Sequence, residues 1–146
     1  MASRPTPAEI LNRFYEAETL YMASAPSERD FSNTMGVHVS PDIHLFQSPD
    51  LPWGGDYQGH AGFQKWSEAM GSYFSSLEVL EPKVFEKDGA DEVVVTSTLK
   101  LTVKGDDKQW IAPLVQVMKV DREKEWIVEI RPMYWNVAGL RELLGL

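Results

Sequence analysis

The second half of the sequence contains four consecutive runs of strand-forming residues, and these limit the fold more than any other feature. The runs cover roughly residues 77–87, 91–104, 109–120 and 125–136. Short polar segments at 87–89, 105–107 and 121–124, rich in Asp, Gly, Lys and Glu, separate them. Such segments are typical of tight turns, so the pattern predicts four strands in an antiparallel meander.

The first half is predicted to be mainly helical. Thr6, Pro7 and Glu9 form a capping box with proline at the first helical position. The apolar residues that follow recur at helical spacing, and the charged residues mostly take other faces, so a helix is expected to end near Ala25-Pro26. The apolar set is Ile10, Leu11, Phe14, Ala17 and Tyr21, and the charged set is Glu9, Arg13, Glu16 and Glu18.

Further elements follow along the chain. Residues 28–35 favour a second, shorter helix closed by Gly36. Residues 43–47 favour a short strand, and the prolines and glycines of 49–55 favour an irregular loop. Residues 60–74 favour a third amphipathic helix with an aromatic face, and the final segment VAGLRELLGL favours a short closing helix.

Length and composition exclude several classes of protein. A chain of 146 residues makes one domain, residues 1–146, and its net charge of −8 argues against a nucleic-acid partner. There is no cysteine, which excludes thiol chemistry and disulfides. No run of about 18 apolar residues and no leader segment is visible, so neither a membrane partner nor export is expected, and a cytoplasmic location is the default.

Two stretches resemble a known family. LPWGGDYQGHAGF at 51–63 and EIRPMYWN at 129–136, in this order, resemble the SnoaL-like polyketide cyclases of the nuclear transport factor 2-like (NTF2-like) superfamily. The resemblance implies an α+β fold shaped like a cone, with three N-terminal helices packed on a curved, mainly antiparallel sheet. It also implies a homodimer, a pocket inside the cone and, in many members, no cofactor.

The strand at 125–136 provides the first candidate site. Strand alternation puts Glu129, Arg131 and Met133 on one face with Ile127. The residues alone leave open whether that face meets solvent, a dimer partner or the pocket, and the resemblance favours the pocket. Glu129 would then be a general acid or base whose pKa is raised by burial and lowered by Arg131. Met133 would contact the substrate.

Other polar candidates are placed by strand parity or by the resemblance. His38 follows the second predicted helix, where relatives bring a polar residue over the pocket, and is taken as a second proton-transfer group. Gln116 is the single polar residue on an apolar strand face, and it either satisfies a neighbouring group or binds the ligand. Gln47 is expected to point inward as a neutral hydrogen-bonding group, with His44 on the opposite face. Asn136 stands where relatives often have aspartate, and is expected to cap the last turn.

Aromatic residues could either fill the core or line a cavity for a polycyclic substrate. Trp53 and Tyr57 lie in the glycine-rich loop and are expected at the cavity rim. Tyr15 and Trp66 lie on predicted helices and are expected to contact the substrate.

The leading hypothesis is a cofactor-independent isomerase or cyclase of secondary metabolism that acts by acid-base catalysis on a small polycyclic molecule, with a semipinacolase-like isomerase as its most specific form. P-loop, GxSxG, GxGxxG and HExxH motifs are missing from the sequence, and three scattered histidines make no metal site. Two alternatives stay open. One is a non-catalytic ligand-binding or dimerisation module, and the other is an epoxide hydrolase.

Overall fold

The computed structural model describes residues 4–146, which form a single six-stranded sheet covered by helices. The strand order is β2-β1-β6-β5-β4-β3, and every neighbouring pair is antiparallel except β1 and β6, which run parallel. The strands are β1 (Val39–Gln47), β2 (Gly55–Gln58), β3 (Phe74–Glu86), β4 (Glu92–Val103), β5 (Gln109–Asp121) and β6 (Trp126–Tyr134). The predicted four-strand meander is therefore confirmed as β3 to β6.

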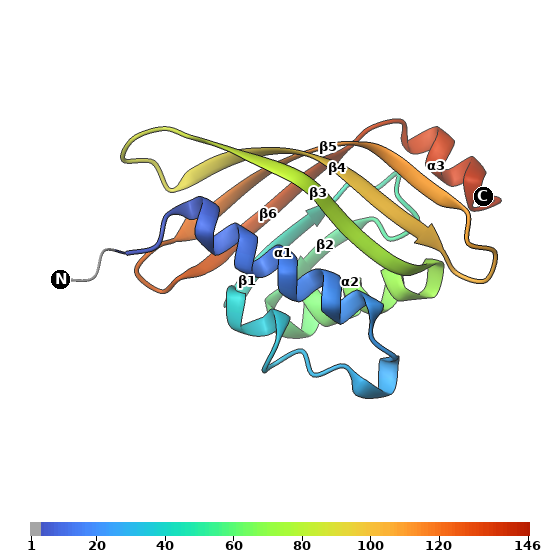
Figure 1. The fold of residues 1–146 in the computed structure, drawn as a ribbon, viewed down its shortest axis with the longest axis horizontal. Coiled ribbons are helices and arrows are strands. Elements are labelled where there is room, and N and C mark those ends of the chain that lie inside the picture. Colours follow the sequence, from blue (N-terminus) through green and yellow to red (C-terminus); the bar gives the residue numbers. More distant parts are fainter. Residues whose placement is uncertain (1–3) are drawn as a thin grey trace.

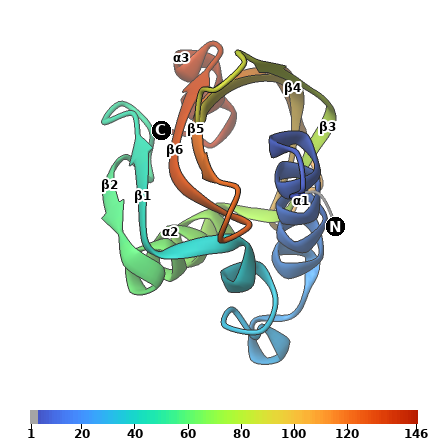
Figure 2. The same cartoon turned by 90° about the vertical axis from the view of Figure 1, so that its left-hand side faces the viewer.

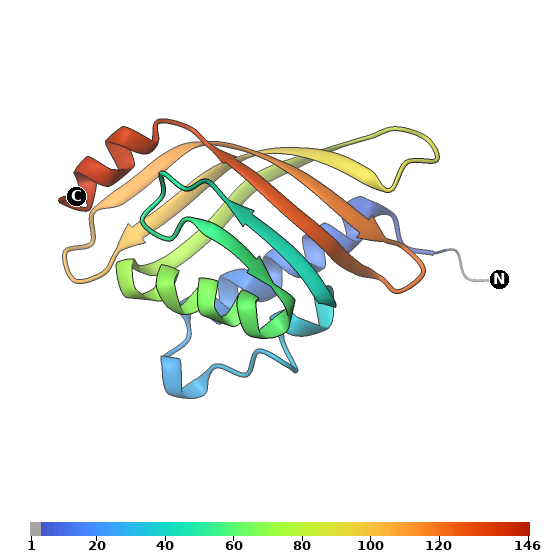
Figure 3. The same ribbon diagram turned by 180° about the vertical axis from the view of Figure 1, so that it is seen from behind.

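Two helices cover the concave side of this curved sheet. Helix α1 (Pro7–Ala23) lies along β3, and α2 (Gly59–Tyr73) lies along β1 and β2 (Figure 1). Viewed along the strands, the sheet bends from β2 round to β3 and the two helices occupy its open side (Figure 2). From behind, the β1–β2 hairpin runs beside α2, and α3 (Val137–Leu143) lies at the far end of the sheet (Figure 3). This is the expected α+β cone.

The first helix begins and ends as its sequence predicts. The Thr6 hydroxyl accepts a hydrogen bond from the Glu9 amide at 3.2 Å, which satisfies one of the free N–H groups of the first turn. The helix ends at Ala23, just before Pro26, and Ser24 caps it.

The predicted second helix at 28–35 is wrong. The chain forms only two short 3-10 turns there, Pro26–Glu28 and Met35–His38. Polar side chains between them bond locally instead, since Asn33 donates to the Asp30 carboxylate at 2.8 Å and the Thr34 hydroxyl donates to the Asp30 carbonyl. Such short-range bonds compete with helix formation.

The strand β6 contains a bulge that reverses its side-chain alternation. Val120 pairs with Ile127, but the preceding residue of β5, Lys119, pairs with Glu129, so Val128 is an extra residue on β6. One extra residue exchanges the two faces of the strand beyond it. As a result Ile127 and Ile130 both point into the core, although they are three positions apart.

The C-terminal helix is capped by Asn136, as expected. Its backbone is in the left-handed region at φ 52°, and its side-chain oxygen accepts a hydrogen bond from the Gly139 amide at 3.0 Å. Among the helices of residues 4–146, none combines the length and apolar composition of a membrane span.

Candidate functional site

The concave face of the sheet and the two covering helices enclose a narrow cavity of about 20 Å³. A cavity of this size has room for about one water molecule, so a larger ligand enters only if lining side chains move. Most of its lining is aliphatic or aromatic. The polar side chains in the lining are those of Glu18, Gln47, Trp66, Gln116 and Tyr134.

Glu18 is the carboxyl group of the cavity. It lies in α1, one helical turn after Phe14, and only 6% of it is exposed. Within residues 4–146 no basic side chain forms an ion pair with it. Burial penalises the charged form and raises the pKa of Glu18 to about 8, so the side chain is mainly protonated at neutral pH.

Two amides in the cavity wall are held by aromatic hydroxyl and indole groups. The Tyr15 hydroxyl donates to Gln116 Oε1 at 2.6 Å, and Trp53 Nε1 donates to Gln47 Oε1 at 3.2 Å. Each bond joins a helix or loop to the sheet, so it fixes the direction in which the amide points. Burial raises the pKa of Tyr15 and, to a lesser degree, the negative charge of Glu18 does the same, so Tyr15 remains a neutral hydrogen-bond donor.

Trp66 differs from Trp53 in having no hydrogen-bond acceptor. Its side chain is 4% exposed and lines the cavity, and its Nε1–H has no partner among residues 4–146. Buried polar groups are nearly always paired, so this donor requires an explanation.

Several solved structures have the same architecture, among them TerC and proteins from Burkholderia and Jannaschia. The sequence itself matches no protein-family model and no curated protein. TerC, crystallised with polyporic acid, superposes with a TM-score of 0.73 at 17% identity over 95% of this chain and 98% of TerC. An NTF2-like protein of unknown function from Burkholderia pseudomallei gives 0.72 at 15% identity, covering 95% of this chain and 97% of its own. A protein provisionally named a SnoaL-like polyketide cyclase from Jannaschia gives 0.70 at 15%, covering 98% and 97%.

The chain has the NTF2-like fold. The TM-scores of 0.70–0.73 confirm the expected fold, while identities of 15–17% leave the activity open.

The expectation that Glu129, Arg131 and Met133 face the cavity is wrong. The β6 bulge turns them to the outer face of the sheet, and Ile130, Pro132 and Tyr134 line the cavity instead. Glu129 lies 3.9 Å from Lys119 and 3.8 Å from Arg131, and the Arg131 guanidinium stacks 4.0 Å from the centre of the Phe46 ring. These contacts are typical of a partly solvated sheet surface, which was the alternative interpretation of this strand.

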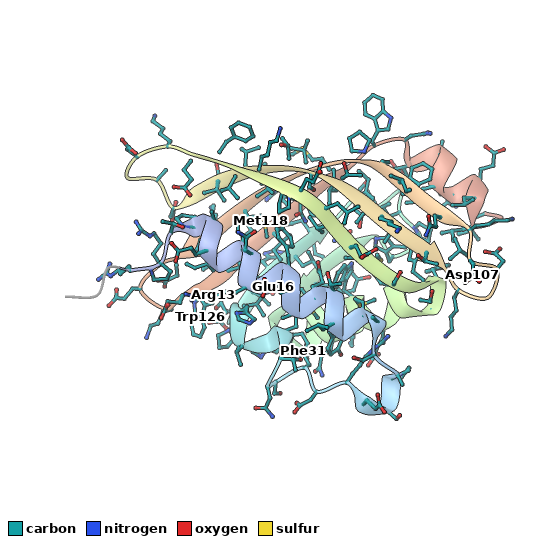
Figure 4. All side chains as sticks on the ribbon, in the orientation of Figure 1. Arg13, Glu16, Phe31, Asp107, Met118 and Trp126 are labelled. Carbon is teal, nitrogen blue, oxygen red and sulfur yellow. The ribbon has the colours of Figure 1, made fainter. Side chains whose placement is uncertain are left out.

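His38 also lies outside the cavity lining. It ends the second 3-10 turn and is close enough to Arg13 and Glu16 to feel their charges. Figure 4 shows Arg13 and Glu16 on α1. Partial burial, followed by the positive charge of Arg13, lowers the pKa of His38, and Glu16 opposes this in part. The histidine is therefore mainly neutral near pH 7 and is not in contact with the buried carboxyl group.

The loop aromatics Trp53 and Tyr57 are not at the cavity rim. Trp53 is buried against Phe74 and Tyr134, with ring centres 5.4 and 5.9 Å away. The Tyr57 hydroxyl donates to the Trp53 carbonyl at 2.8 Å and so fastens the loop to β2. Trp53 acts on the cavity through Gln47 and through its contact with Tyr134, because both of these residues line it.

Three of the predicted contact residues do line the cavity, and these are Gln47, Gln116 and Trp66. Tyr15 reaches it through its bond to Gln116. Glu18 was missed, because it was grouped with the charged residues of the polar face. Its spacing of four from Phe14 and seven from Leu11 is the signal that places it on the apolar stripe of α1.

No three His, Asp or Glu side chains converge on a possible metal position anywhere in residues 4–146. The polar groups that line the cavity are one carboxyl, two amides, one indole N–H and the phenol of Tyr134.

Proposed function

We propose that this protein is a cofactor-independent isomerase or cyclase that moves a proton within a compact, neutral intermediate of secondary metabolism, with Glu18 as the proton-transfer group. The observation that carries the proposal is the isolated carboxyl group of Glu18 in an apolar cavity. Structural neighbours that bear the provisional name polyketide cyclase support a reaction of this type.

The chemistry needs one group that can both accept and donate a proton. A carboxyl group with a pKa of about 8 is well suited to this at neutral pH, since both of its protonation states are populated. A positioned acid or base of this kind contributes about 10²–10⁴-fold to a rate. The amide of Gln116, oriented by Tyr15, is proposed to bind an oxygen of the substrate.

A proton-exchange assay tests the proposal without knowledge of the natural substrate. We expect the protein to catalyse exchange of the α-hydrogens of 1-tetralone with D₂O, because a buried base beside a bound ketone removes and returns such protons. The reactive form is the Glu18 carboxylate. The exchange rate should therefore rise about tenfold per pH unit below pH 8 and level off above it. Mass spectrometry of the ketone measures the rate.

Two variants make the assay specific. Glu18→Gln removes the base and should reduce exchange to the uncatalysed rate, whereas Glu129→Gln makes the same chemical change on the outer face and should retain it within about twofold. Exchange that survives Glu18→Gln would contradict the assignment of the base.

A ligand-binding protein without catalytic activity is the second candidate. It is favoured by the small number of reactive groups, since Glu18 is the only carboxyl among residues 4–146 that lines the cavity. TerC was crystallised with a small molecule, which supports binding of an organic ligand equally well under either proposal. Binding of 1-tetralone with no enhanced exchange at any pH would favour this candidate.

A homodimer formed through the outer face of the sheet is part of the proposal. Ile111, Val115 and Met133 leave 59%, 36% and 52% of their surfaces exposed there, and Val115 and Met133 are direct cross-strand neighbours. A second copy would cover this apolar patch. We expect a dimer by light scattering, and a monomer for Val115→Lys/Met133→Glu. A wild-type monomer at high concentration would contradict the homodimer.

A further inference from the structure

The unpaired N–H of Trp66 is the strongest unexplained feature of the cavity. Only 4% of Trp66 is exposed, and no acceptor for its Nε1–H exists among residues 4–146. The fold can satisfy a buried indole, as Gln47 does for Trp53 at 3.2 Å. An unmet donor in a cavity wall is therefore best explained by a partner that arrives with the ligand.

The direction of this N–H is fixed by packing. Trp66 lies in α2, three residues after Phe63, and the two rings meet edge to face with centres 5.2 Å apart. The next residue, Ser67, and Met70 one turn further on are both fully buried. Because the ring cannot turn toward solvent without unpacking α2, its N–H stays buried in a residue that lines the cavity.

The charges of the cavity decide which acceptor fits. Within the described part of the chain, residues 4–146, no Lys, Arg or His lines the cavity. Its one carboxyl group there, Glu18, is mainly protonated at neutral pH because burial disfavours the charged form. An anionic ligand would find no cation to offset its loss of hydration and would sit beside a group that itself becomes negative above pH 8. A neutral carbonyl oxygen accepts from an indole N–H without that cost.

We propose that Trp66 binds the carbonyl oxygen of an uncharged one- or two-ring ketone and so sets both the class and the orientation of the ligand. This inference deepens the proposed function, and it rests on the same cavity. In the proposed reaction the indole would stabilise the oxygen as negative charge develops on it, while Glu18 removes the proton from the neighbouring carbon.

The test observes the indole N–H directly. The chain has five tryptophans, so the ¹⁵N-labelled protein gives five indole signals, and the signal missing from Trp66→Phe belongs to Trp66. If Trp66→Phe does not fold, sequential assignment of the wild-type spectrum identifies the Trp66 signal instead. 1-Tetralone should move the Trp66 signal downfield, as a new hydrogen bond does. Tetralin, which has the same ring system without the oxygen, should not move it downfield and serves as the control for ring-current effects.

Affinities provide a second measurement. Trp66→Phe should weaken 1-tetralone binding about five- to tenfold and change tetralin binding less than twofold. Trp110→Phe, a partly buried tryptophan outside the cavity lining, is the matched control and should change neither. 1-Naphthoate, an anion of similar size, should not displace the ketone at equal concentration.

Three results would overturn the inference. These are failure of 1-tetralone to bind, equal shifts of the Trp66 signal with ketone and hydrocarbon, or displacement of the ketone by naphthoate. The outcome is independent of catalysis, because the shift reports binding and the deuterium exchange reports proton transfer. A Trp66 shift without exchange would leave the inference standing and remove the proposed enzyme. Exchange without a Trp66 shift would overturn the inference and leave the proposed enzyme standing.

Discussion

At pH 9 the Glu18→Gln variant is expected to have a higher free energy of unfolding than the wild type. The difference between variant and wild type should be larger at pH 9 than at pH 4 by on the order of 3–5 kcal/mol. The pKa of Glu18 rises from 4.5 to about 8 in the folded chain because burial penalises the carboxylate. Glutamine has nearly the same shape and no charge, so it avoids that penalty.

The sign of the effect follows from proton binding. Between pH 4.5 and 8 the folded chain keeps a proton that the unfolded chain releases. The folded state therefore loses stability relative to the unfolded state as the pH rises through this window, and the contribution of the protonated carboxyl is fully present only below it. Urea unfolding of both proteins at each pH measures the difference directly.

Glu129→Gln is the matched control for this comparison. Glu129 is on the outer sheet surface with two long ion-pair contacts, so its removal should change stability by less than about 1 kcal/mol. If the free energies of unfolding of the wild type and Glu18→Gln changed in parallel with pH, the carboxyl group would be hydrated or paired. This result would contradict the site as described. Such a destabilising residue persists in proteins mainly where function requires it.

The second large effect is expected for Phe63→Ala. Phe63 is 1% exposed and lies against Phe14 and Phe31, with ring centres 6.1 and 5.7 Å away, and against Trp66. Removing a fully buried ring should cost about 3–5 kcal/mol of unfolding free energy. Because Phe63 also lines the cavity, its removal enlarges the binding space by about one ring.

Ligand should recover part of that loss. A two-ring ketone such as 1-tetralone fills the new space, and a ligand at 100 times its Kd stabilises the folded state by about 2.7 kcal/mol. Thermal unfolding with and without the ketone measures the recovery. Phe85→Ala, on an exposed strand residue, is the control and should cost less than about 1 kcal/mol. Equal losses at the two positions, or no recovery by ligand, would contradict the cavity assignment.

Opposite responses of the two variants would locate the function in the cavity. Glu18→Gln is expected to gain stability at high pH and lose proton transfer, whereas Phe63→Ala is expected to lose stability and gain space. A purely structural cavity has no reason to retain a destabilising acid on one wall and an unpaired indole on another.

The sequence by itself determined the architecture apart from the helix expected at 28–35. Turn residues and strand-forming runs defined the meander, and the capping box and apolar spacing defined α1 and α2. These signals are local, because each depends on residues within a few positions of one another. Parity also placed Gln116 and Gln47 inside correctly, since β5 carries no bulge at Gln116 and Gln47 ends a regular segment of β1.

The tertiary structure alone decided the chemistry of the site. One extra residue at Val128 turned Glu129 and Arg131 outward, and a bulge of this kind is set by pairing with β5, which no short stretch of sequence encodes. Glu18 became the acid because α1 packs on the sheet and leaves only 6% of Glu18 exposed, which removes water from its carboxyl group. Burial and hydrogen-bond partners depend on segments distant in the chain, such as Tyr15 and Gln116, and only the folded protein brings these together.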